Sequence, residues 1–183
     1  MTKDEVIKLA ATTAVDATLK ALEREKRKQV KSRHDRRLRN TRLLLKNYPL
    51  LREHSDQSIY SVKQLDEPAN AIDLLDNLEN LDNETYIQSI KRSATRTRII
   101  LEHIETMTKI YEAYCQGTGK EEDMRRYRTL RARYFDGVSV EQIATDESVD
   151  TRTIYRDINA ASEKLSALIF GIDGLSAMSE TCQ

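Results

Sequence analysis

Apolar residues recur three or four positions apart through most of the chain, which is the period of an α-helix. In the clearest row the two spacings alternate regularly; its members are Ile87, Ile90, Ala94, Thr97, Leu101, Ile104, Thr108, Tyr111 and Cys115. Such a heptad seam is typical of helices that pack side by side. We therefore predict a long central helix over residues 84–116, which Asp82 or Asn83 caps and the Gly-Thr-Gly of residues 117–119 ends.

The pattern before the central helix divides into two parts. Residues 1–53 are rich in helix formers and predict basic N-terminal helices, with an interruption near Pro49 because a proline disfavours helix at the residue before it. Residues 54–83 hold Pro68, several Asn and Asp residues and only short apolar runs, so we predict an acidic linker with one short helix near residues 69–78.

After the central helix, residues 120–175 predict a three-helix unit, followed by a flexible tail over residues 176–183. An Asp-Gly pair at 136–137 ends the first helix, and Ser139 with Gln142 forms the pattern of a capping box for the second. A tight turn precedes a final helix capped by Asp150 or Thr151. The apolar row of that final helix is Ile154, Ile158, Ala161, Leu165 and Leu168. Two helices joined this way predict a helix-turn-helix.

Composition supports an all-α fold. The chain of 183 residues has five glycines, two prolines and no tryptophan, which leaves little turn chemistry for a β-rich fold. Apolar residues make up 39% and charged residues 33%, proportions that favour helices with much solvated surface. The predicted fold class is thus an all-α helical bundle with a long central helix and a C-terminal helix-turn-helix.

Charge is segregated along the chain although its formal sum is zero. Residues 24–46 include eleven basic and two acidic side chains, whereas residues 64–84 include seven acidic and no basic ones. The basic stretch suggests phosphate contacts, for which the candidates are Arg33, Arg36, Arg37 and Arg39, or a helix that contacts RNA polymerase. The alternative is a solvated face whose charge the acidic linker balances.

The sequence offers no pattern typical of a catalytic or metal site. Cys115 and Cys182 do not have the spacing of zinc ligands, and we find no phosphate-binding glycine loop or nucleophile motif. We therefore expect neither an enzyme nor a bound metal or cofactor. The N-terminus lacks the features of a signal peptide and the chain has no apolar run long enough to span a membrane, so we expect a cytoplasmic protein without membrane contact.

The C-terminal segment YRTLRARYFDGVSVEQIATDESVDTRTIYRDINAASEKL, residues 127–165, resembles the region 4 helix-turn-helix of sigma-70 factors. Together with LSALIFGIDGL (165–175) and RRLRNTRLLLKNY (36–48), it is similar to small Gram-positive phage activators of the ArpU and RinA type. The sequence departs from the motif at Glu147, where an apolar residue is frequent, and at Ser148, where glycine is frequent. We expect Glu147 to remain solvated and Ser148 to form the turn without the freedom of glycine.

The resemblance implies that the N-terminal half of the final helix enters the major groove of double-stranded DNA. The residues it would present are Thr151, Arg152, Thr153, Tyr155, Arg156 and Asn159. Arginine can bond two acceptors on guanine, asparagine can pair with adenine, and the helix N-terminus can offer N–H groups to phosphate. The expected function is therefore a sequence-specific transcription regulator that activates phage or prophage late genes, with Arg152 and Arg156 as the main contacts.

Two alternatives stay open from the sequence. A small terminase subunit of a phage also combines a helix-turn-helix with an oligomerisation helix, and it would recognise a packaging site. The helices could instead form a protein-binding adaptor of RNA polymerase. Because a single helix-turn-helix reads few base pairs, we expect a homodimer. The heptad seam is one candidate interface, although the N-terminal helix could fill it from within the chain.

Overall fold

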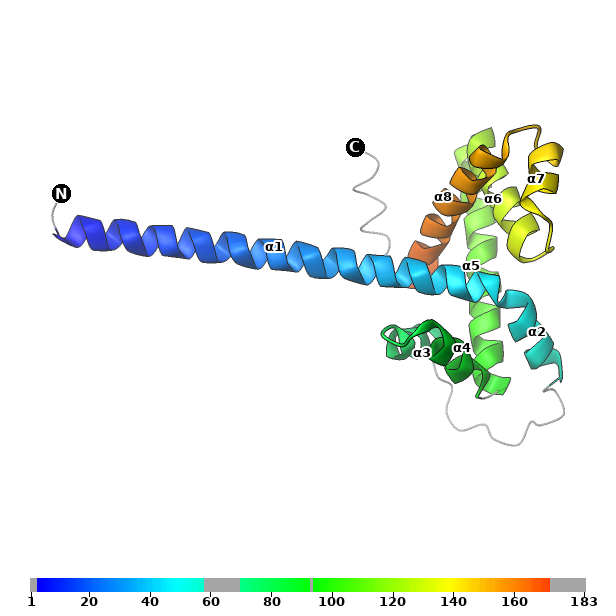
Figure 1. Ribbon diagram of the computed structural model, residues 1–183, viewed down its shortest axis with the longest axis horizontal. Coiled ribbons are helices and arrows are strands. Elements are labelled where there is room, and N and C mark those ends of the chain that lie inside the picture. The colour runs from blue at the N-terminus through cyan, green and yellow to red at the C-terminus, as the bar shows by residue number, and fades with distance from the viewer. Residues whose placement is uncertain (1–2, 58–69, 93, 172–183) are drawn as a thin grey trace. The chain divides into compact units, whose positions relative to one another are not determined.

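The computed structural model describes residues 3–57, 70–92 and 94–171, and all regular structure in these residues is helical (Figure 1). The helices are α1 (Lys3–Lys46), α2 (Tyr48–Gln57), α3 (Ala71–Leu78), α4 (Asn83–Lys91), α5 (Ala94–Thr118), α6 (Glu121–Tyr134), α7 (Val140–Asp146) and α8 (Thr151–Ile169). The predicted all-α class is confirmed. The predicted tail over residues 176–183 lies outside the described residues.

The chain separates into two units, Met1–Arg36 and Arg37–Gln183. The described residues of the first unit all belong to α1, and the side chains described there are exposed apart from the half-buried Arg36. Its exposed side chains include four large apolar ones that are more than half accessible to solvent: Val15, Leu19, Leu22 and Val30. The second unit contains the hydrophobic core and every other described helix.

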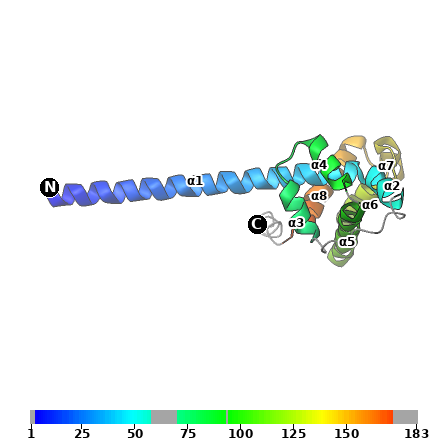
Figure 2. The same ribbon diagram turned by 90° about the horizontal axis from the view of Figure 1, so that it is seen from below.

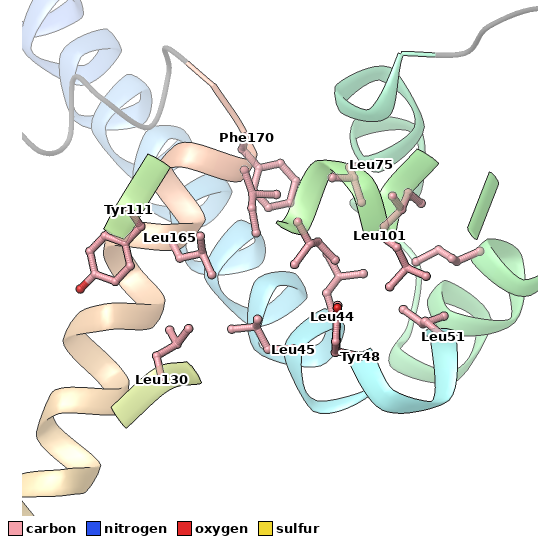
Figure 3. Packing of buried hydrophobic residues seen from close by; sticks show 14 of the residues in the cluster. Leu44, Leu45, Tyr48, Leu51, Leu75, Leu101, Tyr111, Leu130, Leu165 and Phe170 are labelled. Atoms are coloured by element: carbon pink, nitrogen blue, oxygen red, sulfur yellow. The ribbon is translucent and has the colours of Figure 1, made fainter. Parts of the chain in front are cut away.

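The core of the second unit forms around α5. Helices α2, α4, α6 and α8 pack against α5, and both views show α6 beside α8 (Figures 1 and 2). Leu44 and Leu45 at the end of α1, with Tyr48 and Leu51 of α2, enter the same cluster as Leu165 of α8 (Figure 3). The α1–α2 corner matches the sequence prediction, since α1 ends at Lys46 and Pro49 lies in the first turn of α2, where its missing N–H is not needed.

The heptad seam is buried within the chain. The structure describes the burial of eight of its nine residues, all except Ala94, and each of the eight is less than 8% exposed. Helices of the same unit cover it, so this seam does not offer a surface to a second copy. The candidate dimer interface at the seam is therefore corrected: the chain fills it internally.

The single helix predicted over residues 84–116 is divided into α4 and α5. Asp82 caps α4 by accepting the backbone N–H groups of Glu84 and Thr85, each at 3.1 Å, and α4 ends at Lys91. The Arg96 guanidinium donates to the Ser89 carbonyl at 3.0 Å, and the Thr97 hydroxyl donates to the Ile90 carbonyl at 3.1 Å. These side chains satisfy carbonyls that a continuous helix would pair with backbone N–H groups, which makes the interruption inexpensive.

Tyr86 gives a test of the core. Its side chain is fully buried and its hydroxyl forms no hydrogen bond with the described residues; burial raises its pKa. Since an unpaired buried hydroxyl loses its hydration without compensation, Tyr86→Phe should raise the free energy of unfolding by about 1 kcal/mol in urea titrations. The control is Tyr48→Phe, because the Tyr48 hydroxyl donates to Glu105 at 2.6 Å and accepts from Arg52 at 2.9 Å. This control should lower stability; an equal loss from Tyr86→Phe would contradict the expectation.

Candidate nucleic-acid interface

Helices α6, α7 and α8 form the candidate interface, and two hydrophobic clusters hold them. Val140, Ile143 and Ala144 of α7 pack with Ile154 and Ile158 of α8 in a small cluster. Further along α8, three apolar residues belong to the main core: Ala161, Leu165 and Ile169. The predicted inward row of α8 is therefore buried as expected, apart from the half-buried Leu168.

Side-chain caps set the start of both α7 and α8. Ser139 Oγ accepts the Gln142 backbone N–H at 3.2 Å, which forms one half of the predicted capping box. The other half is absent, because the Gln142 side chain donates to Asp146 at 2.8 Å instead. Asp150 caps α8 by accepting the Thr153 N–H at 2.8 Å and also accepts the Thr153 hydroxyl. These two hydrogen bonds lower the pKa of Asp150. Its carboxylate already occupies the helix N-terminus, which disfavours a phosphate at the same place.

The turn between α7 and α8 is a Schellman motif. The Val149 N–H donates to the Ala144 carbonyl at 3.0 Å, and the Ser148 N–H donates to the Thr145 carbonyl at 3.1 Å. These two bonds require a left-handed residue after the helix, and Ser148 has φ of 54°. The turn thus forms without glycine, as the sequence analysis required, but a residue with a Cβ is strained in this conformation.

The expectation that the Glu147 side chain remains solvated was wrong. The side chain is only 17% exposed, and Arg128 of α6 binds both carboxylate oxygens, with Nε to Oε1 and Nη2 to Oε2 each at 2.7 Å. These bonds lower the pKa of Glu147 and raise that of Arg128. Arg128 also donates to Glu121 at 2.7 Å. A planar guanidinium suits this two-point contact, which fixes the end of α7 against α6.

A second ion pair holds α8 against α6. Asp157 is 3% exposed, and its Oδ2 accepts from Arg125 Nε at 2.7 Å; Arg126 Nε lies 3.6 Å from its Oδ1. The apolar pattern of α8 did not predict this contact. A signal was present, because Asp157 falls between Ile154 and Ile158 on the inward face of α8, where a carboxylate needs a basic partner.

Most of the predicted DNA-contact residues lie on one exposed face of α8. Thr151, Arg152, Tyr155, Arg156 and Asn159 are exposed. Thr153 differs, since it is half-buried and its hydroxyl donates to Asp150 Oδ2 at 3.0 Å. Thr153 is therefore committed to the cap of α8 rather than presented with the other five.

The four predicted phosphate contacts separate into two groups. Arg37 is buried, with Nη2 3.3 Å from Asp76 Oδ1 and its guanidinium 5.2 Å from the centre of the Phe170 ring. Arg39 donates to the carbonyl of Leu81 at 3.3 Å. Arg37 is therefore not available for the predicted phosphate contact, and its pair with Asp76 supports the alternative that the acidic segment balances basic charge. Arg39 is exposed, and its phosphate contact stays a prediction.

Arg33 and Arg36 lie in the first unit, Met1–Arg36. Arg33 is exposed, and Arg36 is half-buried and donates to Ser32 at 3.0 Å.

In the described part of the chain, no helix has the length and apolar character needed to cross a membrane. Nor do those residues include a cluster of three or more His, Cys, Asp or Glu side chains that could hold a metal ion. The chain matches no family model, no curated protein and no solved structure.

Ser148 provides a test of the turn. Ser148→Gly removes the Cβ that makes the left-handed conformation costly, a gain partly offset by the greater freedom of glycine in the unfolded chain. We expect the free energy of unfolding to rise by about 0.5–1 kcal/mol, seen as a higher Tm in calorimetry. Ser148→Ala keeps the Cβ and serves as the control without that gain. A lower Tm for the glycine variant would argue against strain at this turn.

Glu147 provides a test by pH. Because its folded pKa lies below the ordinary 4.5, the ion pair stabilises the fold above that pH, and the contribution is lost as pH falls through the folded pKa. Glu147→Gln should lower the free energy of unfolding at pH 7 by about 1–2 kcal/mol, a figure reduced because Arg128 is 42% exposed.

The free energies of unfolding of Glu147→Gln and of the wild-type protein should become more similar below about pH 4, as measured by denaturant titration at several pH values. Glu163→Gln, at an exposed position in the interior of α8, is the control that should change stability little at any pH. A difference that stays constant down to pH 3 would contradict the role of the ion pair.

Proposed function

We propose that the protein is a sequence-specific, double-stranded-DNA-binding transcription regulator in which α7 and α8 act as a helix-turn-helix. The part of the proposal that concerns activation of phage or prophage late genes, with RNA polymerase as a partner, rests on the sequence resemblance. The part that concerns DNA binding is supported by the chemistry of α8, and one observation carries it.

That observation is a contrast between the arginines of α6 and those of α8. All five α6 arginines are engaged: Arg125 with Asp157, Arg126 with Glu122 and Asp123, Arg128 with Glu147, Arg131 with the Tyr127 hydroxyl and Arg133 with the Val138 carbonyl. Arg152 and Arg156 are exposed and make no ion pair or side-chain hydrogen bond with the described residues. Ten guanidinium N–H donors therefore remain available on one face of a firmly packed helix.

The spacing of these arginines suits base recognition. Residues four apart in a helix lie on one face about 6 Å apart along its axis, close to the rise of two base steps in DNA. Each guanidinium can bond O6 and N7 of a guanine in the major groove. Because α8 is held by both hydrophobic clusters and by Asp157, the two arginines start from a fixed backbone, and only their side chains have to be ordered on binding.

The direct test compares DNA affinity of single variants. The full chain is used to select a binding site from random double-stranded DNA and from the region upstream of its own gene, and Kd is then measured by fluorescence anisotropy. Arg152→Ala and Arg156→Ala should each weaken binding to the selected site about 5- to 150-fold, since one bidentate contact contributes about 1–3 kcal/mol. Each should also relax the base preference at one position.

Arg98→Ala is the matched control, because it removes the same charge from an exposed site of α5, where Arg98 pairs with Glu102 of its own helix. It should leave the base preferences unchanged. Unchanged affinity of both α8 variants at physiological salt would contradict the site. Selection of a phage packaging sequence together with a ring-shaped oligomer by mass measurement would favour the terminase alternative.

A further inference from the structure

Arg42 of α1 and Asn159 of α8 meet although 117 positions separate them in the sequence. The Arg42 Nη2 group donates to the Asn159 Oδ1 atom at 3.3 Å, and both side chains are exposed. Arg42 was not among the predicted DNA contacts. Asn159 lies three residues after Arg156, so the contact brings α1 to the edge of the exposed arginine face of α8.

The part of α1 that carries Arg42 is firmly placed in its unit. Leu44 and Leu45 have no exposed surface, and Arg37 and Arg39 bind the α3 region, as described above. The contacts of these neighbouring residues thus fix the backbone at Arg42, and the Arg42 side chain extends to Asn159. A guanidinium on a fixed backbone can orient a neighbouring group through a hydrogen bond, because the backbone at one end of that bond does not move.

An asparagine amide has an acceptor end and a donor end, and a solvated amide can rotate to present either one. Arginine has donors only, so a bond to Arg42 selects the orientation with Oδ1 toward α1. The Asn159 NH2 group then faces away from α1. An amide held this way can donate to an acceptor on a base edge, and the second lone pair of Oδ1 can still accept from the adenine amino group.

We propose that Arg42 is a positioning residue that orients the amide of Asn159 for reading one base pair. The inference rests on the proposed function of α8. Arg42 would then affect which base pair is preferred at one position of the site, and it would not affect the general attraction of the protein to DNA. A direct phosphate contact by Arg42 would have the opposite signature, because phosphate contacts carry no sequence information.

The test uses the full chain and the site selected by the wild-type protein, with all four base pairs substituted at each position. Arg42→Ala and Asn159→Ala should each reduce the base preference at one and the same position by about 5- to 50-fold, within the range of a single base contact. The double variant should lose no more than Asn159→Ala alone, since Arg42 acts through Asn159. Preferences at positions that depend on Arg152 and Arg156 should remain.

Lys46→Ala is the matched control. Lys46 is exposed one turn further along α1, and its substitution removes the same charge as Arg42→Ala without affecting a bond to Asn159. It should not change any base preference, and all variants should keep the wild-type Tm. Uniform weakening by Arg42→Ala on every sequence, with a salt slope reduced by about one, would overturn the inference and show a phosphate contact. No effect of Arg42→Ala would overturn it as well. Absence of DNA binding by the wild-type chain would instead overturn the proposed function, on which this inference depends.

Discussion

The arrangement of the second unit depends on the burial of helix α8 in two hydrophobic clusters. The first half of α8 packs on α7 through Ile154 and Ile158, and its second half enters the core through Leu165 and Ile169. A helix held at both halves cannot rotate about its axis without exposing one of these apolar groups, at a cost of about 1.5–3 kcal/mol for each. The rotational position of α8, and with it the identity of its exposed face, follows from this burial.

Ion pairs with α6 add directional contacts to this packing. Apolar contacts allow small sliding movements, whereas the Asp157–Arg125 and Glu147–Arg128 pairs each require a defined geometry. The first acts on α8 and the second on the turn that precedes it. Since Ser148 holds a left-handed conformation that favours glycine, the adjacent Glu147 contact helps to retain the turn despite its strain. The polar side of α6 thus positions the helix whose own arginines remain exposed.

Periodicity predicted the buried row of α8, and local residue types predicted the cap at Ser139 and the break near Pro49. They also placed Asp82 and Asp150 among two candidate caps each, and the structure selects these two. The sequence pattern did not predict which partners the arginines would find, because Arg37 contacts Asp76, Arg128 contacts Glu147 and Arg42 contacts Asn159 across 39, 19 and 117 positions. For the same reason the heptad seam could be recognised but not its occupant. The α4–α5 break depends on side-chain bonds to carbonyls, for which the sequence has no regular pattern.

The distribution of charge bears on how the proposed DNA contact would gain specificity. Residues 1–36 contain ten basic and six acidic side chains, whereas residues 37–183 contain 20 basic and 24 acidic ones, a formal charge of −4. The formal charge of the second unit therefore gives it no net long-range attraction for a polyanion, and at physiological salt fields decay over about 8 Å. Under the proposed function, Arg152 and Arg156 would act only where they touch DNA, so a duplex without matching base edges would gain little from contact with α8. Low affinity for non-specific sequences raises the ratio by which a correct site is distinguished, and that ratio decides occupancy in a genome.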